Sequence, residues 1–219
     1  MLLHNRNDVL LDQSGNLGDG AFVVGVLSCK DFSSATGNIK KLRVNTGFRC
    51  TLSHVSRNKW KAQYAKRVID FWVDRSNVKI DLFVIRRSGA KDNERPLEKL
   101  SRYTEYVSRL VDLSRRTIDG KCRLISQRHF KKDRQTQFEK MLLRRNKGIG
   151  SIVYIMESQS DLLQLLDLVV GATQASQNTT KDPIENTMKN DLILYLTHKL
   201  RTDSLAKSLL HSKCSITFT

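Results

Sequence analysis

The order of the apolar segments along this 219-residue chain constrains its fold more than any other feature. Two runs rich in Val and Leu come first, at residues 8–12 and 21–28, and a Gly-rich stretch separates them. We predict that they form a hairpin-like pair of strands. After residue 57, helical and strand-like patterns alternate, which predicts further strands joined by helices. An antiparallel start followed by such alternation predicts an α/β fold, a mixed sheet with helices on both faces.

The individual elements follow from apolar periodicity and from Gly, Pro and polar breaks. We expect one domain over residues 1–175, then a polar linker and a C-terminal helical extension over 176–219. Pro183 can open a helix in that extension. The expected strands are 42–52, 78–85, 122–126 and 151–156; the expected helices are 57–75, 97–118, 132–146, 160–175 and, with weaker periodicity, 191–210.

The charge of the chain favours a polyanionic partner. There are 38 Lys and Arg residues against 22 Asp and Glu, giving a formal net charge of +16. Neutralising a polyanion with so many cations releases counterions, and nucleic acid is the foremost such partner. A merely basic protein, or one that touches an acidic protein face or an anionic membrane, would show the same excess, so charge alone leaves these alternatives open.

Two further features indicate a cytoplasmic protein that does not enter a membrane. The longest apolar run, around 162–172, is interrupted by Gln164 and Asp167 and is too short to span a bilayer. The four cysteines lie far apart without a CxxC pair, so we expect reduced thiols rather than a zinc site or a disulfide framework.

Asp12 and Asp167 are the acids whose positions call for an explanation. Asp167 lies in a helix otherwise made of Leu and Val, where an unpartnered carboxylate would cost several kcal/mol. A divalent cation, a basic side chain or backbone hydrogen bonds would compensate for that cost. Asp12 ends the first predicted strand, where α/β sheets expose functional groups, although an Asp before Ser-Gly is also typical of a turn.

The motifs around these acids resemble the family numbered 3800 among the domains of unknown function. That family opens with Asp-Glu-Ser-Gly and closes with an acid-Ser pair followed by Leu-Gln-x-Ala-Asp-Leu-x-x-Gly. The matching strings here are LDQSGN at 11–16, AFVVGV at 21–26, Glu157-Ser158 and LQLLDLVVGA at 163–172. The resemblance covers about residues 8–175 and is weakest in the middle. It implies a ribonuclease H-like fold and a nuclease activity that uses Mg²⁺ or Mn²⁺.

Carried over by motif, the resemblance implies that Asp12, Glu157 and Asp167 are the catalytic, metal-binding acids. Two positions depart from the family pattern, because Gln13 stands where Glu is usual and Gln127 where Asp is usual. Hydrolysis by two metals needs several carboxylates, and Gln offers only a neutral oxygen. The departures therefore weaken or remove a second metal site, unless acids such as Asp133 and Asp161 replace the missing ones.

A basic segment follows the strand expected beside Asp12 and is the preferred contact for nucleic acid. Phe130 and His129 within it could stack on a base or simply pack, and His54 is a weaker candidate for touching substrate. The predicted nucleic-acid-binding residues are Arg128, His129, Lys131, Lys132 and Arg134.

Two functions therefore remain open. The first is a metal-dependent nuclease that acts on RNA or DNA. The second is a degenerate relative that binds nucleic acid or docks a protein partner through its C-terminal helix, for example in an antiviral defence or mobile-element complex.

Overall fold

The computed structural model of the protein describes residues 7–16, 19–52, 58–86, 95–115, 120–177 and 187–219. Most of the predicted strands and helices are present, with ends that shift by a few residues. In chain order the elements are β1 (Asp8–Asn16), β2 (Asp19–Cys29), α1 (Phe32–Thr46), α2 (Lys59–Arg75), β3 (Val78–Arg86), α3 (Pro96–Ser114), β4 (Cys122–Ser126), α4 (Lys132–Arg145), β5 (Ile149–Tyr154), the short 3₁₀ helix η3 (Glu157–Gln159), α5 (Asp161–Ser176), α6 (Thr187–Lys199), β6 (Leu209–Leu210) and β7 (Cys214–Phe218).

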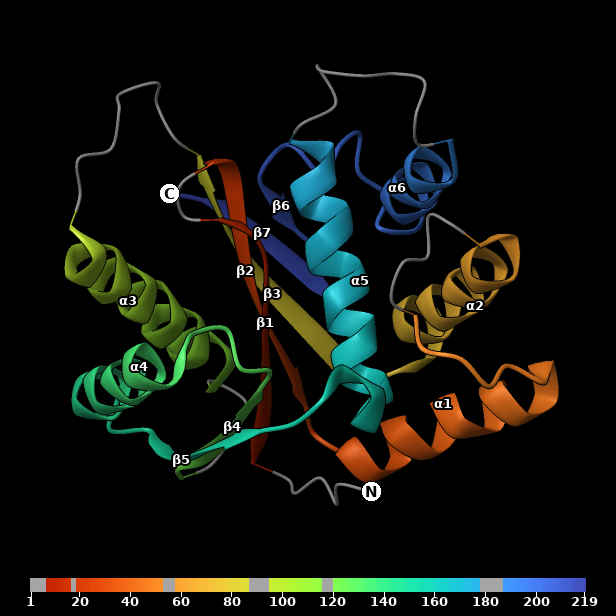
Figure 1. The fold of residues 1–219 in the computed structure, drawn as a ribbon. Helices are drawn as coiled ribbons and strands as arrows, with labels where there is room; N and C mark the ends of the chain where they lie inside the picture. Colours follow the sequence, from red (N-terminus) through yellow and green to blue (C-terminus); the bar gives the residue numbers. More distant parts are fainter. Residues whose placement is uncertain (1–6, 17–18, 53–57, 87–94, 116–119, 178–186) are drawn as a thin grey trace.

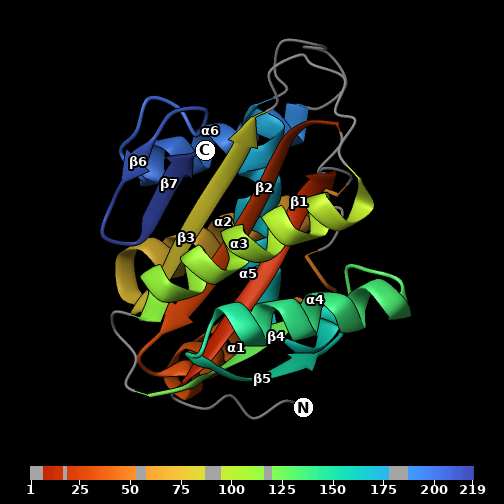
Figure 2. The same cartoon turned by 90° about the vertical axis from the view of Figure 1, so that its left-hand side faces the viewer.

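The strands form one seven-stranded mixed sheet in the order β5-β4-β1-β2-β3-β7-β6. β1 and β2 pair antiparallel, as predicted, and β2 pairs antiparallel with β3. β4 runs parallel to β1, and β5 runs parallel to β4. Helices α3 and α4 cover one face of the sheet, whereas α1, α2, α5 and α6 cover the other (Figures 1 and 2). The predicted α/β class, a mixed sheet flanked by helices, is confirmed.

The two faces of the sheet carry separate hydrophobic cores. Along β1, Leu10 packs in the core that contains α1, α2, α5 and α6, whereas Val9 and Leu11 pack in the core beneath α3 and α4. This alternation follows from the two-residue repeat of a strand. Asp12 comes two residues after Leu10, so it belongs to the face that α5 covers.

The predicted strand at 42–52 is wrong, because residues up to Thr46 belong to α1. Local capping explains the helix: the Asp31 side chain accepts a hydrogen bond from the Ser34 backbone N at 2.9 Å. At the other end Gly47 takes the left-handed conformation, with φ of 65°, and closes the helix.

The end of the chain also differs from the expectation, because it is not helical throughout. α6 is the predicted C-terminal helix, but it ends at Lys199, and β6 and β7 follow it. β7 pairs in parallel with β3, and its residues Cys214 and Ile216 are buried in the core. Residues 209–218 therefore extend the main sheet. Such short strands carry only two or three alternating apolar positions, which is too weak a pattern for sequence-based detection.

All four cysteines are free thiols, as predicted, and three of them are buried. Among the helices that the structure describes, none combines the length and the apolar character needed to cross a bilayer.

Candidate functional site

Asp12 lies in the middle of β1 and is only 3% exposed, so the prediction that it ends the first strand is wrong: β1 continues to Asn16 because its pairing with β2 extends past Asp12. The preceding residue, Leu11, pairs in parallel with Ser126, the last residue of β4. The Ser126 hydroxyl donates to the Leu11 carbonyl at 3.1 Å and so fastens the end of β4 to β1. The basic segment that follows β4 therefore starts beside Asp12, as the sequence predicted.

Helix α5 packs directly over the strand pair that carries Asp12. Gly25 is the partner of Asp12 across the β1–β2 pair. A Cβ atom at Gly25 would lie 2.6 Å from Cγ2 of Val170 and 3.3 Å from Cδ1 of Leu166, so glycine is what allows the helix to sit this close. A Cβ atom at Gly15 would lie 3.5 Å from Cγ of Gln174. Val170 thus lies beside the level of Asp12 in β1, and Gln174 lies beside Gly15, three residues later in β1. Helix α5 therefore runs in the same direction as β1 (Figure 1).

This alignment brings Asp167 level with Asp12. Asp167 precedes Gln174 by seven residues on the same helix face, a rise of about 10.5 Å. Asp12 precedes Gly15 by three strand residues, a rise of about 10 Å. Asp167 is partly buried, and no described atom lies within 4 Å of a Cβ placed on Gly171, one turn further along α5.

Glu157, the third predicted acid, begins η3, the short element that leads from β5 into α5. Its side chain and residue His54 both lie outside the described residues. Among the side chains that the structure does describe, no three from His, Cys, Asp and Glu gather as a metal-binding group. The described carboxylates of the candidate site are therefore those of Asp12 and Asp167.

The two acids considered as replacements lie in different surroundings. Asp161 forms an ion pair with Arg43, whose Nη2 lies 2.6 Å from Oδ1, so this carboxylate already serves a structural role. Asp133 is exposed in the first turn of α4. The proposed replacement by Asp161 is therefore not supported by its contacts.

Sequence reasoning missed Arg43, which joins α1 to α5 and to the segment after α1. Its Nη2 donates to Oε1 of Gln164 at 3.1 Å, and its Nη1 donates to the carbonyl of Cys50 at 2.6 Å. The same Gln164 oxygen accepts from the Leu52 backbone N at 2.9 Å. The amide three residues before Asp167 is thus a structural partner, and no local pattern could reveal a contact that spans 121 residues.

His129 has a partly buried, uncharged ring beside the end of β4. Its Nε2 lies 3.0 Å from the Ser126 hydroxyl, and burial lowers the pKa of His129 to about 4. Phe130 packs edge-on against Tyr103, with ring centroids 5.4 Å apart, and also against Phe138. Of the two roles considered for Phe130, stacking on a base or packing in the core, the structure shows packing.

The cations of the same segment are exposed. The Arg128 guanidinium lies over the Tyr154 ring, 6.0 Å from its centroid. Lys131, Lys132 and Arg134 follow at the start of α4 and face solvent. Four positive charges therefore surround the end of β4, on the strand next to the one that carries Asp12.

Tyr103 is a further residue near Asp12 that the sequence did not indicate. It is fully buried in α3, and its hydroxyl has no hydrogen-bond partner within the described part of the chain. Burial, and then the negative charge of Asp12, raise the pKa of Tyr103 well above its ordinary value. Its hydroxyl therefore stays protonated and can act as a hydrogen-bond donor.

Comparisons with known proteins give a distant likeness in fold. No protein-family model matches the sequence, and no curated protein matches it either. A chain from the structure of the PCNA:RNase HII complex of Archaeoglobus fulgidus aligns with a TM-score of 0.46 and 10% identity, over 93% of this chain and 96% of that one. A mutant of Bst-RNase HIII aligns with a TM-score of 0.44 and 10% identity, over 90% of this chain and 56% of that one. Likenesses this distant assign no activity to the chain.

Proposed function

We propose that the chain is a metal-dependent nuclease that cleaves phosphodiester bonds of RNA or DNA, as its resemblance to the family numbered 3800 implies. Asp12, Glu157 and Asp167 are its proposed catalytic acids. One observation carries the proposal: Asp12 is buried in the middle of the central strand β1, beside the carboxyl end of β4 and level with Asp167 on α5, and exposed cations follow β4.

The donor set suits one Mg²⁺ or Mn²⁺ ion. Such ions prefer oxygen ligands and are commonly held by one or two carboxylates together with water and substrate phosphates. Asp12 and Asp167 offer two carboxylates, and Glu157 would add a third. The neutral amides Gln13 and Gln127 add no charge, so a second ion would lack the carboxylates it needs. When bound, a single ion supplies Lewis-acid chemistry and lowers the pKa of a coordinated water.

The chain's own groups have separate tasks in this proposal. Asp12, on the sheet, and Asp167, on the helix, would hold the ion. Glu157 completes the set of ligands or accepts a proton from the attacking water. The exposed cations Arg128, Lys131, Lys132 and Arg134 contact phosphates, and His129, being neutral, contributes a hydrogen bond rather than charge.

A second candidate function is binding without cleavage. It is favoured by the amides at positions 13 and 127 and by the engagement of Asp161 with Arg43, which together leave few free carboxylates at this edge. In that case the basic surface would bind nucleic acid, or α6 would dock a protein partner in a cytoplasmic defence or mobile-element complex.

The deciding experiment incubates the purified protein with labelled single-stranded RNA, single-stranded DNA and RNA–DNA hybrid, with Mn²⁺, Mg²⁺ or EDTA. We expect metal-dependent cleavage of at least one substrate that falls to background in Asp12→Asn and in Asp167→Asn. Asp31→Asn is the matched control, because asparagine also caps a helix and should leave cleavage unchanged.

Thermal unfolding of each variant shows whether the fold is intact. Cleavage that survives both substitutions in the site would contradict the assignment of the acids. Salt-sensitive binding without any cleavage would instead support the second function.

A further inference from the structure

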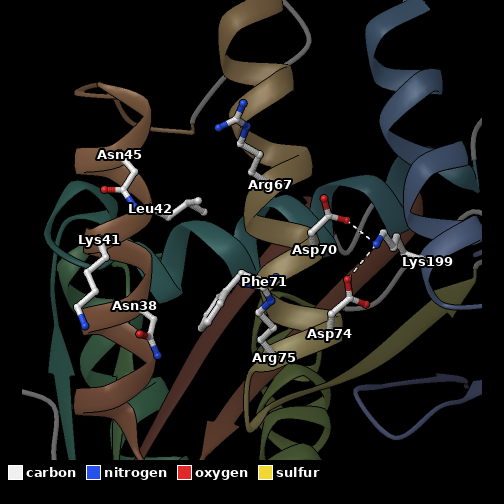
Figure 3. A pocket seen from close by; sticks show the side chains of 10 residues that line it. All are labelled: Asn38, Lys41, Leu42, Asn45, Arg67, Asp70, Phe71, Asp74, Arg75 and Lys199. Carbon is white, nitrogen blue, oxygen red and sulfur yellow. Dashed lines mark hydrogen bonds and ion pairs between the residues drawn. The ribbon is translucent and has the colours of Figure 1, made fainter.

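A groove lies between α1 and α2 (Figure 3), and neither Asp12 nor Asp167 is among the residues that line it. Its main hollow has a volume of about 550 Å³. Leu42 from α1 and Phe71 from α2 point toward each other and form an apolar floor (Figure 3). A second hollow of about 260 Å³ shares Asn45 and Arg67 with the first, so the two are neighbours along α2. The groove therefore follows the length of α2.

Four cations and two carboxylates line this groove. Of the cations, Lys41 comes from α1, Arg67 and Arg75 come from α2, and Lys199 comes from α6 (Figure 3). The first three are exposed, and within the described part of the chain none of them forms an ion pair. A lining with a net positive charge beside an apolar floor suits an anionic ligand that also has flat apolar surfaces.

The two carboxylates of the groove, Asp70 and Asp74, share one cationic partner on the α6 side of the groove. Lys199 of α6 lies 2.7 Å from Oδ1 of Asp70 and 3.0 Å from Oδ2 of Asp74. The hydroxyl of Tyr195 also donates to Asp70, at 2.6 Å. Both carboxylates turn toward α6 in Figure 3. The side of the groove that faces α1 therefore keeps its positive charge.

An aromatic side chain stands exposed at the far end of the groove. Trp60, in the first turn of α2, borders the second hollow and is 68% exposed. The other tryptophan, Trp72, is fully buried. Trp60 thus contributes little to the core, and its indole ring is available to stack on a planar group.

We propose that this groove binds a single-stranded segment of nucleic acid, with phosphates at Lys41, Arg67 and Arg75 and a base stacked on Trp60. The proposal rests on the nucleic-acid function proposed above and adds a binding surface that the candidate acids do not line. A positively charged groove with aromatic platforms is how proteins bind single strands, whose bases expose their faces. The Arg43–Asp161 ion pair ties α1, which lines the groove, to the first turn of α5, the helix that carries Asp167.

Intrinsic fluorescence tests the proposal directly, because only Trp60 of the two tryptophans is exposed. Titration of the full chain with an unlabelled single-stranded oligonucleotide should quench its fluorescence, and Trp60→Phe should abolish the quenching. A duplex of equal length should quench weakly, because its bases are stacked on each other. Equal quenching by poly-glutamate would overturn the proposal, since that polyanion has no bases.

The cations are tested by the salt dependence of binding. Each phosphate contact with a single strand contributes about 0.7 to the slope of log K against log salt. The triple variant Lys41→Ala, Arg67→Ala, Arg75→Ala should therefore lower the slope by about 2. The control changes three exposed cations on the opposite face of the sheet, Lys140→Ala, Arg144→Ala and Lys147→Ala, and should leave the quenching unchanged. If the triple variant folds poorly, Arg67→Ala alone should lower the slope by about 0.7.

The outcomes separate this proposal from the nuclease assignment. The wild-type chain could bind or cleave nucleic acid without quenching of Trp60, and the triple variant could keep the wild-type salt slope. Those results would overturn the proposed binding in the groove and leave the nuclease proposal intact. Quenching that persists in Asp12→Asn, without cleavage, would support a groove independent of the acids. Failure of the wild-type chain to bind any nucleic acid would overturn both.

Discussion

Arg123 and Asp8 form a two-pronged ion pair between β4 and β1. Nε of Arg123 lies 2.8 Å from Oδ1 of Asp8, and Nη2 lies 2.8 Å from Oδ2. The Asp8 side chain is fully buried, whereas that of Arg123 is 26% exposed. The two residues are also partners in the parallel pairing of the strands. The pair therefore helps to fix the register that brings the end of β4 beside Asp12.

Arg123→Met should destabilise the protein by about 3–5 kcal/mol, because it removes the cation facing a buried carboxylate. Urea unfolding measures the change. Arg109→Met is the control, since its pair with Glu105 is exposed and should be worth less than about 1 kcal/mol. Adding Asp8→Asn to Arg123→Met should recover part of the loss. Equal, small effects of the two arginine substitutions would contradict this role for Arg123.

The stability of the protein should fall in mild acid because of His129. Burial lowers its pKa to about 4, against about 6.5 for an unperturbed histidine. Between these values the unfolded chain binds a proton that the folded chain does not, so stability decreases as the pH falls from about 6.5 to about 4. Above that window the effect is absent, and below it the loss is complete, at most about 3 kcal/mol.

Urea unfolding across this pH range measures the effect in the wild type and in His129→Gln. Other groups also titrate in acid, so the informative quantity is the difference between the two pH profiles. The variant should lose less stability than the wild type between pH 6.5 and 4. Parallel profiles would show that the ring is not buried as described.

Local patterns were enough to predict most of the fold. The strand at 122–126 was predicted with the bounds that β4 has, because its apolar residues are flanked by Gly120 and a polar segment. α2 and α5 followed from helical periodicity. α1 was missed because Gly37 and several polar residues dilute its apolar stripe, so that the caps, rather than the periodicity, identify it.

The candidate site was harder to predict, because it depends on contacts between distant segments. Asp12 and Asp167 were singled out by motif. That they lie at the same height along β1 and α5 follows only from the packing of α5 on Gly15 and Gly25. Nothing near Arg43 in the sequence identifies Asp161 and Gln164 as its partners. The sequence around Tyr103 likewise indicates only an ordinary core residue, and its proximity to Asp12 is evident only in the folded structure.

Gly25→Ala should disturb the packing of α5 against the sheet. The added Cβ would lie 2.5 Å from Cδ2 of Leu82 and 2.6 Å from Cγ2 of Val170, so side chains must shift, at a cost of about 1–3 kcal/mol. Gly37→Ala is the matched control within α1, where an added Cβ meets no described atom within 4 Å. It should stabilise the protein by about 0.5–1 kcal/mol, because alanine favours a helix interior over glycine. Thermal unfolding should therefore move in opposite directions for the two variants.

The last strand should be necessary for the stability of the whole sheet. Ile216 is 2% exposed and pairs with Leu82 of β3. Ile216→Ala removes buried side-chain atoms and should cost about 2–5 kcal/mol in urea unfolding. Thr217→Ala, at the exposed neighbouring position of the same strand, should change stability by no more than about 0.5 kcal/mol. If β7 were a dispensable extension, the two substitutions would have equally small effects; a single cooperative transition at lower urea for Ile216→Ala alone would show that residues 209–218 fold with the rest of the domain.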